Sequence, residues 1–215
     1  ERESLAKIIE FMDRNPSVGA AQGVIYDFYG NVDNAGFLCN EMLANYPVKA
    51  ELDRPIYVTY PSGAYVVIRR EVIEKLGVPF DWYGFMYFDD WPLGYKIWRL
   101  GYKVVALPVP AGRHLGGGSG GLKSPRTVYY LYRGLALVIE LSNSRLRRLA
   151  KALIFRSLPV KNSVKNPAIL RAALHGLQDG FALGSRLRKR GIYLDIYSAP
   201  LIRFGFPELL IGNLA

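Results

Sequence analysis

The sequence has a single cysteine, Cys39, among its 215 residues. One thiol excludes an intrachain disulfide and a thiolate metal cluster, and its usual role is that of a small buried apolar residue. The sequence also lacks an uninterrupted apolar run of about 18 residues and a signal-peptide pattern, so we expect neither a transmembrane helix nor secretion. These absences favour a reducing, cytoplasmic setting. Half of the residues are hydrophobic, which is enough to bury a core.

Acidic residues are nearly missing from one segment. Residues 145–190 hold 12 Lys/Arg and one Asp, whereas residues 1–144 hold 15 basic and 15 acidic residues. One segment therefore carries the whole imbalance of a chain with net charge +10. A basic segment of this kind favours an anionic partner, either lipid headgroups, nucleic acid or a polyphosphate.

The basic segment has an amphipathic pattern. From Arg145 the chain reads RLRRLAKALIFRSLPV, with leucines and an isoleucine at helical spacing and basic residues between them. Such a helix is suited to an anionic membrane surface, and an ordinary solvated helix packed on the domain is the alternative. Nucleic acid is not expected, because the segment has no recognisable binding motif and few, widely separated aromatic residues.

The glycine run GGGSGG at 116–121 lacks the features of a phosphate-binding loop. It has no Lys-Ser/Thr ending and does not stand at a strand-to-helix turn, so neither a P-loop nor a dinucleotide fingerprint is supported. The run predicts either a lid that closes over substrate or a plain loop.

An acidic pair is the first candidate site. Asp89 and Asp90 follow a stretch rich in aromatic residues and stand where Leu93, Ile97 and Leu100 begin a helical spacing. Carboxylates at a helix N-terminus are held ionised by the exposed amide donors and the helix dipole, and an ionised carboxylate can accept a proton. The alternative is that Asp89 only caps the helix and Asp90 is only a first-turn charge.

A histidine follows the next predicted element. Residues 102–107 predict a buried strand that Pro108 and Pro110 end, and His114 comes shortly after them. A helix packed antiparallel on its following strand would return the chain to the same edge, so we expect Asp90 and His114 to face one cleft. The alternative is that His114 is a surface loop residue.

The other predicted elements alternate between helix and strand, which places the chain in the α/β class. We expect a helix from about Leu5 that stops before Pro16, and strands at 18–26 and 64–68. A helix opened by Arg69 and closed by Gly77 follows, and further helices are expected at 127–141 and within 145–190. Residues 192–196 alternate briefly like a strand.

Several of these stretches resemble the second half of the family 2, GT-A-fold glycosyltransferases, with the rhamnosyl- and galactofuranosyltransferase-like members most similar. The resemblance is carried by four stretches and covers about residues 5–190. They are KIIEFMDRNPSVGAAQGVIYDFYGNVDNAG at 7–36, PSGAYVVIRREVIEKLG at 61–77, the acidic-pair segment through to the histidine, and SPRTVYYLYRG at 124–134. The chain departs from the pattern at Gly134, where the family usually has Asn, and at Pro92, where it commonly has another acid.

The resemblance implies a GT-A-type, Rossmann-like mixed sheet flanked by helices. It implies an acceptor-side catalytic half at 1–144 and a basic amphipathic helical region at 145–215. The family's nucleotide-binding half and its Asp-x-Asp motif are not found, so a C-terminal part is expected. Asp13 and Asp33 do not replace that motif, because neither has a paired acid at the required spacing.

The implied activity of the intact enzyme is inverting transfer of a sugar from a nucleotide-sugar donor to a hydroxyl of a glycan or glycolipid, and the C-terminal part alone is expected to be inactive without the nucleotide-binding half. Asp90 would be the general base and Asp89 would orient it, while His114 would complete the ligand set of a Mn²⁺ or Mg²⁺ ion. The residues expected at the acceptor and sugar site are Ser62, Gly63, Trp82, Trp91 and Arg133. A buried Arg133 would require a carboxylate or a substrate phosphate.

The implied location is the inner face of the membrane, with the protein peripheral and cytoplasmic and residues 145–190 on anionic lipid. Two alternatives stay open: a non-catalytic membrane- or acceptor-docking module, and, less favoured, a nucleic-acid-binding basic domain.

Overall fold

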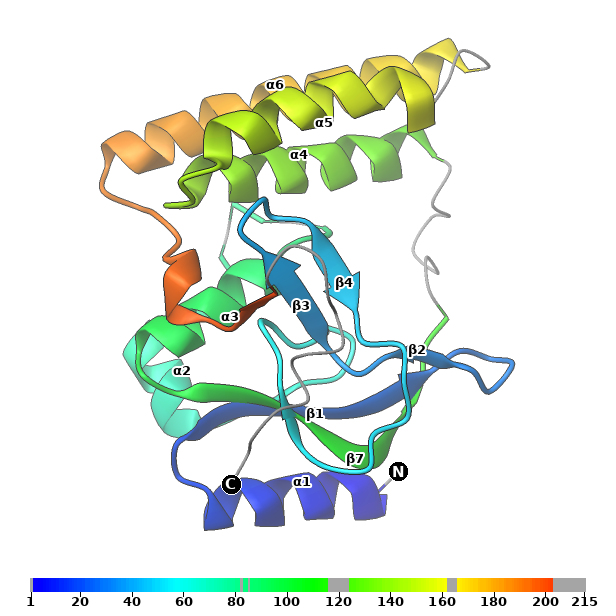
Figure 1. Cartoon of the computed structure of the whole chain (residues 1–215), viewed down its shortest axis with the longest axis vertical. Coiled ribbons are helices and arrows are strands. Elements are labelled where there is room, and N and C mark those ends of the chain that lie inside the picture. The colour runs from blue at the N-terminus through cyan, green and yellow to red at the C-terminus, as the bar shows by residue number, and fades with distance from the viewer. Residues whose placement is uncertain (1, 82, 85, 116–123, 162–165, 203–215) are drawn as a thin grey trace. The chain divides into compact units, whose positions relative to one another are not determined.

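The computed structural model describes residues 2–81, 83–84, 86–115, 124–161 and 166–202 (Figure 1). The chain forms two compact units, and neither is continuous in sequence. The first comprises residues 1–80, 90–116 and 197–215, and the second comprises residues 81–89 and 117–196. The boundary expected after residue 144 falls inside the second unit, and the functional division at that point stays a prediction.

The first unit contains two sheets. In the larger one, β1 (Val18–Tyr26) pairs in parallel with β7 (Lys103–Arg113). Three short strands complete it antiparallel to these two: β2 (Val32–Asn34) and β6 (Val67–Ile68) on β1, and β5 (Ile56–Tyr57) on β7. In the smaller sheet, β3 (Phe37–Asn40) lies between antiparallel β4 (Asn45–Pro47) and parallel β8 (Leu201–Ile202).

Helices flank the larger sheet, as predicted. They are α1 (Arg2–Arg14), α2 (Arg70–Leu76) and α3 (Asp90–Arg99). The apolar stripe of α1 buries Ile8 and Met12 against Val105 and Leu107 of β7. In Figure 1, α1 runs along one side of β1 and β7, and α3 lies on the other. The mixed α/β class is therefore confirmed.

The strand β7 is longer than predicted, because Pro108 and Pro110 lie within it and do not end it. The β1–β7 register shifts at this point, so that Gln22 pairs with Ala106 and Val24 with Pro110. The extra β7 residues form an irregularity that tolerates the missing proline N–H groups. A Cβ on Gly23 would lie 2.4 Å from the Val109 carbonyl oxygen, so this close approach requires glycine.

Most of the remaining elements predicted for the first unit are present, and one is shorter than predicted. The helix that stops before Pro16 and the strand at 18–26 are confirmed. The helix closed by Gly77 is confirmed too, with the glycine at φ 70°. The strand expected at 64–68 is reduced to Val67–Ile68, because only this part pairs with β1.

The second unit contains the helices α4 (Pro125–Leu141), α5 (Arg147–Lys161) and α6 (Pro167–Lys189). A 3₁₀ turn at Ile196–Ser198 follows, and the boundary between the two units falls after its first residue. A glycine stripe on α6 lets α4 approach closely. A Cβ on Gly176 would lie 2.3 Å from the Tyr129 carbonyl oxygen, and one on Gly180 would lie 2.4 Å from that of Arg133. The strand suggested at 192–196 is absent from this described stretch, where Leu194 makes one isolated bridge to Ser142.

Every helix in the described ranges is too short or too polar to span a membrane.

Candidate functional site

Asp90 is the first residue of α3, as the sequence predicts. At this position the carboxylate lies next to the backbone N–H groups that have no partner within the helix, and next to the positive end of the helix dipole. Pro92 lies in the first turn, where a missing N–H is tolerated, so the proline leaves the helix intact.

The turn at Ser62 and Gly63 contacts Asp90 directly. The Gly63 backbone N–H donates to Asp90 Oδ2 at 3.1 Å. Gly63 is exposed, whereas Ser62 is almost fully buried and its Oγ accepts the Ala64 N–H at 3.4 Å. Two of the predicted site residues, Gly63 and Asp90, therefore meet, although they come from distant parts of the chain.

A buried glutamine holds this turn on the sheet, and sequence reasoning missed it. The Gln22 side chain in β1 has no exposed surface, and its Oε1 accepts the Ser62 N–H at 2.6 Å. Its Nε2 donates to the Gly23 carbonyl oxygen at 3.1 Å and to Asn34 Oδ1 at 3.4 Å. The only signal in the sequence was one amide within the apolar run VGAAQGVIY. A polar side chain inside such a strand must find partners within the protein.

His114 pairs with Asp33, a carboxylate that the sequence argument had set aside. Nδ1 of His114 lies 3.5 Å from Asp33 Oδ2, and the side chains are 44% and 36% exposed. The backbone N–H of His114 donates to the Tyr26 carbonyl oxygen at 2.8 Å, which fixes the residue at the end of β7 beside β1. Asp33 Oδ2 also accepts from Asn34 Nδ2 at 3.2 Å. An imidazole and a carboxylate are thus both available to an ion or ligand from solvent.

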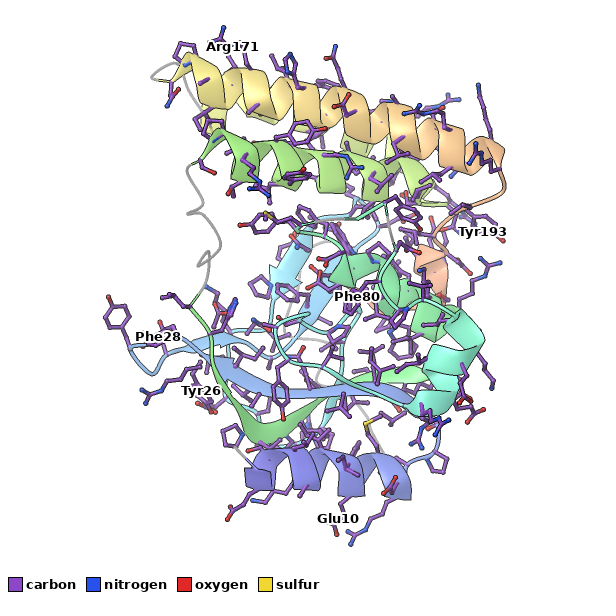
Figure 2. The ribbon with its side chains drawn as sticks, turned by 180° about the vertical axis from the view of Figure 1, so that it is seen from behind. Glu10, Tyr26, Phe28, Phe80, Arg171 and Tyr193 are labelled. Atoms are coloured by element: carbon purple, nitrogen blue, oxygen red, sulfur yellow. The ribbon has the colours of Figure 1, made fainter. Side chains whose placement is uncertain are left out.

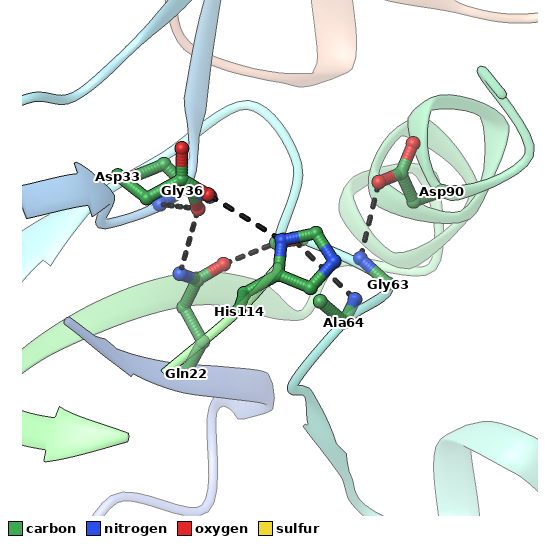
Figure 3. Close-up of polar contacts among 9 residues, drawn as sticks. Gln22, Asp33, Gly36, Gly63, Ala64, Asp90 and His114 are labelled. Atoms are coloured by element: carbon green, nitrogen blue, oxygen red, sulfur yellow. Dashed lines mark hydrogen bonds and ion pairs between the residues drawn. The ribbon is translucent and has the colours of Figure 1, made fainter. Parts of the chain in front are cut away.

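These contacts form one polar chain from Asp90 to His114 (Figure 3). It runs through the following residues in order: Asp90, Gly63, Ser62, Gln22, Asn34, Asp33 and His114. The two residues that the sequence singled out are therefore connected, through partners that it did not identify.

The second unit holds the loop that precedes the acidic pair. Nη1 of Arg133 on α4 donates to the Tyr83 carbonyl oxygen at 2.9 Å. This contact uses only Nη1 of a part-buried side chain, so the carboxylate or phosphate partner expected for Arg133 stays a prediction.

Gly134 supports the same loop by close approach. A Cβ there would lie 2.7 Å from the Tyr87 carbonyl oxygen and 3.2 Å from the Phe88 Cβ. Tyr87 and Phe88 have φ of 61° and 58°, a strained conformation for aromatic residues. Gly134 thus makes room for the residues that lead to Asp89. The Cβ of Asp89 would lie 3.2 Å from a Cβ built on Gly84.

The structure describes only one of the two tryptophans expected at the sugar site. Trp91 has no exposed surface, stacks on Tyr60 with ring centroids 5.6 Å apart, and donates from Nε1 to the Tyr95 hydroxyl at 3.2 Å. It packs as a core residue and offers no surface to a sugar. Trp82 lies outside the described residues, as does the glycine run at 116–121.

A scan of protein-family models and a search of curated proteins gave no match. Among solved structures, one similar chain is described as "Crystal structure of GalNAc-T7 with UDP, GalNAc and Mn2+". The two chains share 14% identity at a TM-score of 0.44, and the alignment covers 85% of this chain and 38% of the other. A likeness at this level identifies neither a family nor an activity for this chain.

Proposed function

We propose that the chain is the acceptor-side part of a GT-A-type glycosyltransferase of the family 2 kind. The intact enzyme transfers a sugar from a nucleotide-sugar donor to a hydroxyl of a glycan or glycolipid, with inversion at the anomeric carbon. The observation that carries the proposal is the hydrogen bond from the Gly63 N–H to Asp90 at the start of α3, within a polar chain that ends at His114. The resemblance of the surrounding sequence supplies the reaction class.

Asp90 acts as the general base. Its negative charge is favoured by the helix N-terminus and by the Gly63 amide, so Oδ1 or Oδ2 can accept the proton of an acceptor hydroxyl. The deprotonated oxygen attacks the anomeric carbon as the bond to the diphosphate oxygen breaks, and the diphosphate leaves with the bonding pair. General-base catalysis of this kind contributes about 10²- to 10⁴-fold. Asp89 precedes the base and orients it.

His114 and Asp33 supply part of a divalent-metal site. Imidazole and carboxylate both bind Mn²⁺, and these two side chains are close together and accessible. Among the described residues no group of three or more His, Cys, Asp or Glu side chains could hold a metal, so the remaining ligands come from elsewhere, such as the donor diphosphate or water. A bound metal would neutralise charge that develops on the leaving diphosphate.

The test of the base is the substitution Asp90→Asn in the full-length protein that contains the nucleotide-binding half, measured by release of nucleoside diphosphate from a panel of UDP-, GDP- and dTDP-sugars with glycan acceptors. Turnover should fall about 10²- to 10⁴-fold. The matched control is Asp53→Asn, a carboxylate exposed on a loop of the same unit, which should leave turnover unchanged. Normal turnover in Asp90→Asn would refute the assignment of the base.

The test of the metal role is His114→Ala, measured by Mn²⁺ titration of the same reaction. The half-saturating Mn²⁺ concentration should rise about 10- to 100-fold through loss of one ligand. His175, exposed on α6, provides the control substitution His175→Ala. An unchanged titration curve for His114→Ala would remove this role.

A further inference from the structure

The helix α5 has an apolar face that the second unit leaves uncovered. Ala150 and Ile154 are buried against the other helices, as expected for an amphipathic helix. Leu149 and Leu153 also lie one turn apart, yet they are 48% and 42% exposed. Phe155 is 43% exposed while its ring stacks on Phe181 of α6 at 5.7 Å. The helix therefore presents large apolar side chains outward as well as inward.

Exposed basic residues lie close in sequence to these leucines and at the end of α6. Arg148 is exposed beside Leu149, and Arg145 is exposed one turn before it. At the end of α6, Arg186 and Lys189 are exposed as well. Every charged residue of α5 itself is basic, and Lys151 among them pairs with Glu140 of α4 at 3.4 Å.

The basic ends of α5 and α6 come together at the C-terminal end of α4. Nη1 of Arg147 and Nη1 of Arg188 both donate to the Glu140 carbonyl oxygen, at 3.4 Å and 3.3 Å. Burial, and then the nearby charge of Arg147, lower the pKa of Arg188 below its ordinary value. These two arginines satisfy the carbonyls at the end of α4, so the fold itself brings like charges to one place.

Two further side chains of the second unit are exposed at the two ends of α6. Arg171 points outward from the start of α6, and Tyr193, 44% exposed, lies shortly after its end (Figure 2). A helix that exposes two leucines, a phenylalanine and an arginine has the composition of an interfacial helix. Such a helix places its apolar side chains at the boundary of headgroups and acyl chains, while the cations stay among the phosphates.

We propose that the outward face of α5, together with the basic ends of α5 and α6, docks on an anionic lipid bilayer. The helix lies in the plane of the membrane surface, Leu149 and Leu153 enter the headgroup region, and the arginines bind lipid phosphates. The exposed leucines decide against nucleic acid, because a backbone-binding surface gains affinity from cations and stacking aromatics and not from leucines. The proposal goes beyond glycosyl transfer and does not depend on it.

The test is co-sedimentation of the full chain with vesicles of 70% phosphatidylcholine and 30% phosphatidylserine, with pure phosphatidylcholine as the neutral comparison. The wild type should bind the anionic vesicles and lose binding in high salt. The double variant Leu149→Ser/Leu153→Ser should bind at least about tenfold more weakly, through loss of inserted apolar surface. Its matched control is Leu5→Ser/Ile9→Ser on α1, where the side chains are 43% and 44% exposed.

A second pair of variants tests the charges. Arg148→Ser and Lys189→Ser should each weaken binding about fivefold. The control substitution Arg70→Ser removes an exposed cation of the first unit, whose side chain is 92% exposed and pairs with Glu74, and should have no effect.

Three outcomes would overturn the proposal: failure of the wild type to bind anionic vesicles, equal losses in the α5 and α1 leucine variants, or binding of double-stranded DNA without vesicle binding. The assay contains no sugar donor, so its outcome and that of the turnover assay are independent. Circular dichroism of each variant verifies that the helices are retained.

Discussion

The substitution Gln22→Leu tests whether one buried amide holds the turn beside Asp90. Leucine has nearly the volume of glutamine, so the change creates little cavity and mainly removes hydrogen bonds. The Ser62 N–H, which donates to Gln22 Oε1 at 2.6 Å, would lose its partner in a buried position. A buried polar group left without a partner costs about 1–3 kcal/mol.

Two further contacts are lost in the same variant, which sets the expected magnitude. Gln22 Nε2 no longer donates to Asn34 Oδ1 or to the Gly23 carbonyl oxygen, although Asn34 Oδ1 keeps the Gly36 N–H at 3.2 Å. We therefore expect the free energy of unfolding of the first unit to fall by about 2–3 kcal/mol. In a chain of this size that change lowers Tm by about 4–12 °C.

The assay is urea unfolding followed by far-UV circular dichroism, with Gln178→Leu as the control. Gln178 is exposed on α6, so its replacement should change the free energy of unfolding by less than about 0.5 kcal/mol. If Gln22→Leu unfolds at the same urea concentration as the wild type and as Gln178→Leu, the buried chain does not hold the turn.

Two other predictions concern packing and reactivity. Gly180→Ala should destabilise the α4–α6 pair by about 1–3 kcal/mol in thermal unfolding, because the added Cβ would lie 2.4 Å from the Arg133 carbonyl oxygen. In the control Gly112→Ala the added Cβ meets no atom within 4 Å, so this variant should keep the stability of the wild type. Equal Tm values for the two variants would contradict this packing. Burial raises the pKa of the Cys39 thiol to about 12. The thiol therefore stays protonated at pH 8, and iodoacetamide should alkylate it only after denaturation. Alkylation is measured by mass spectrometry. Rapid labelling of the native protein would contradict the burial of Cys39.

Elements with a local signal could be predicted from the sequence. The first helix stops before Pro16 as expected, although it begins at Arg2 and not at Leu5. Gly77 closes α2 as expected, and Asp90 was correctly placed at the start of a helix. Local rules failed at Pro108, because the register shift that tolerates the prolines depends on pairing with β1, which is distant in sequence.

The partners of the site residues could not be predicted for the same reason. The side chain that fixes Ser62 comes from β1, 40 positions earlier, and Asp33 reaches His114 only because β2 and β7 both pair with β1. The left-handed backbone at Tyr87 and Phe88 is also unpredictable from residue type, since aromatic residues seldom adopt it. The space left by Gly134 permits it, through a contact between segments 47 positions apart.

The pairing of β8 with β3 has a consequence for the order of folding. Leu201 and Ile202 lie beside Cys39 and Asn40, and the Pro200 carbonyl oxygen accepts from Thr59 Oγ1 across 141 positions. Closing so long a loop is slow relative to the packing of α4 against α6, which lie much closer together in sequence. During synthesis β3 leaves the ribosome long before β8, so nascent chains expose the edge of the smaller sheet until Leu201 and Ile202 have also emerged.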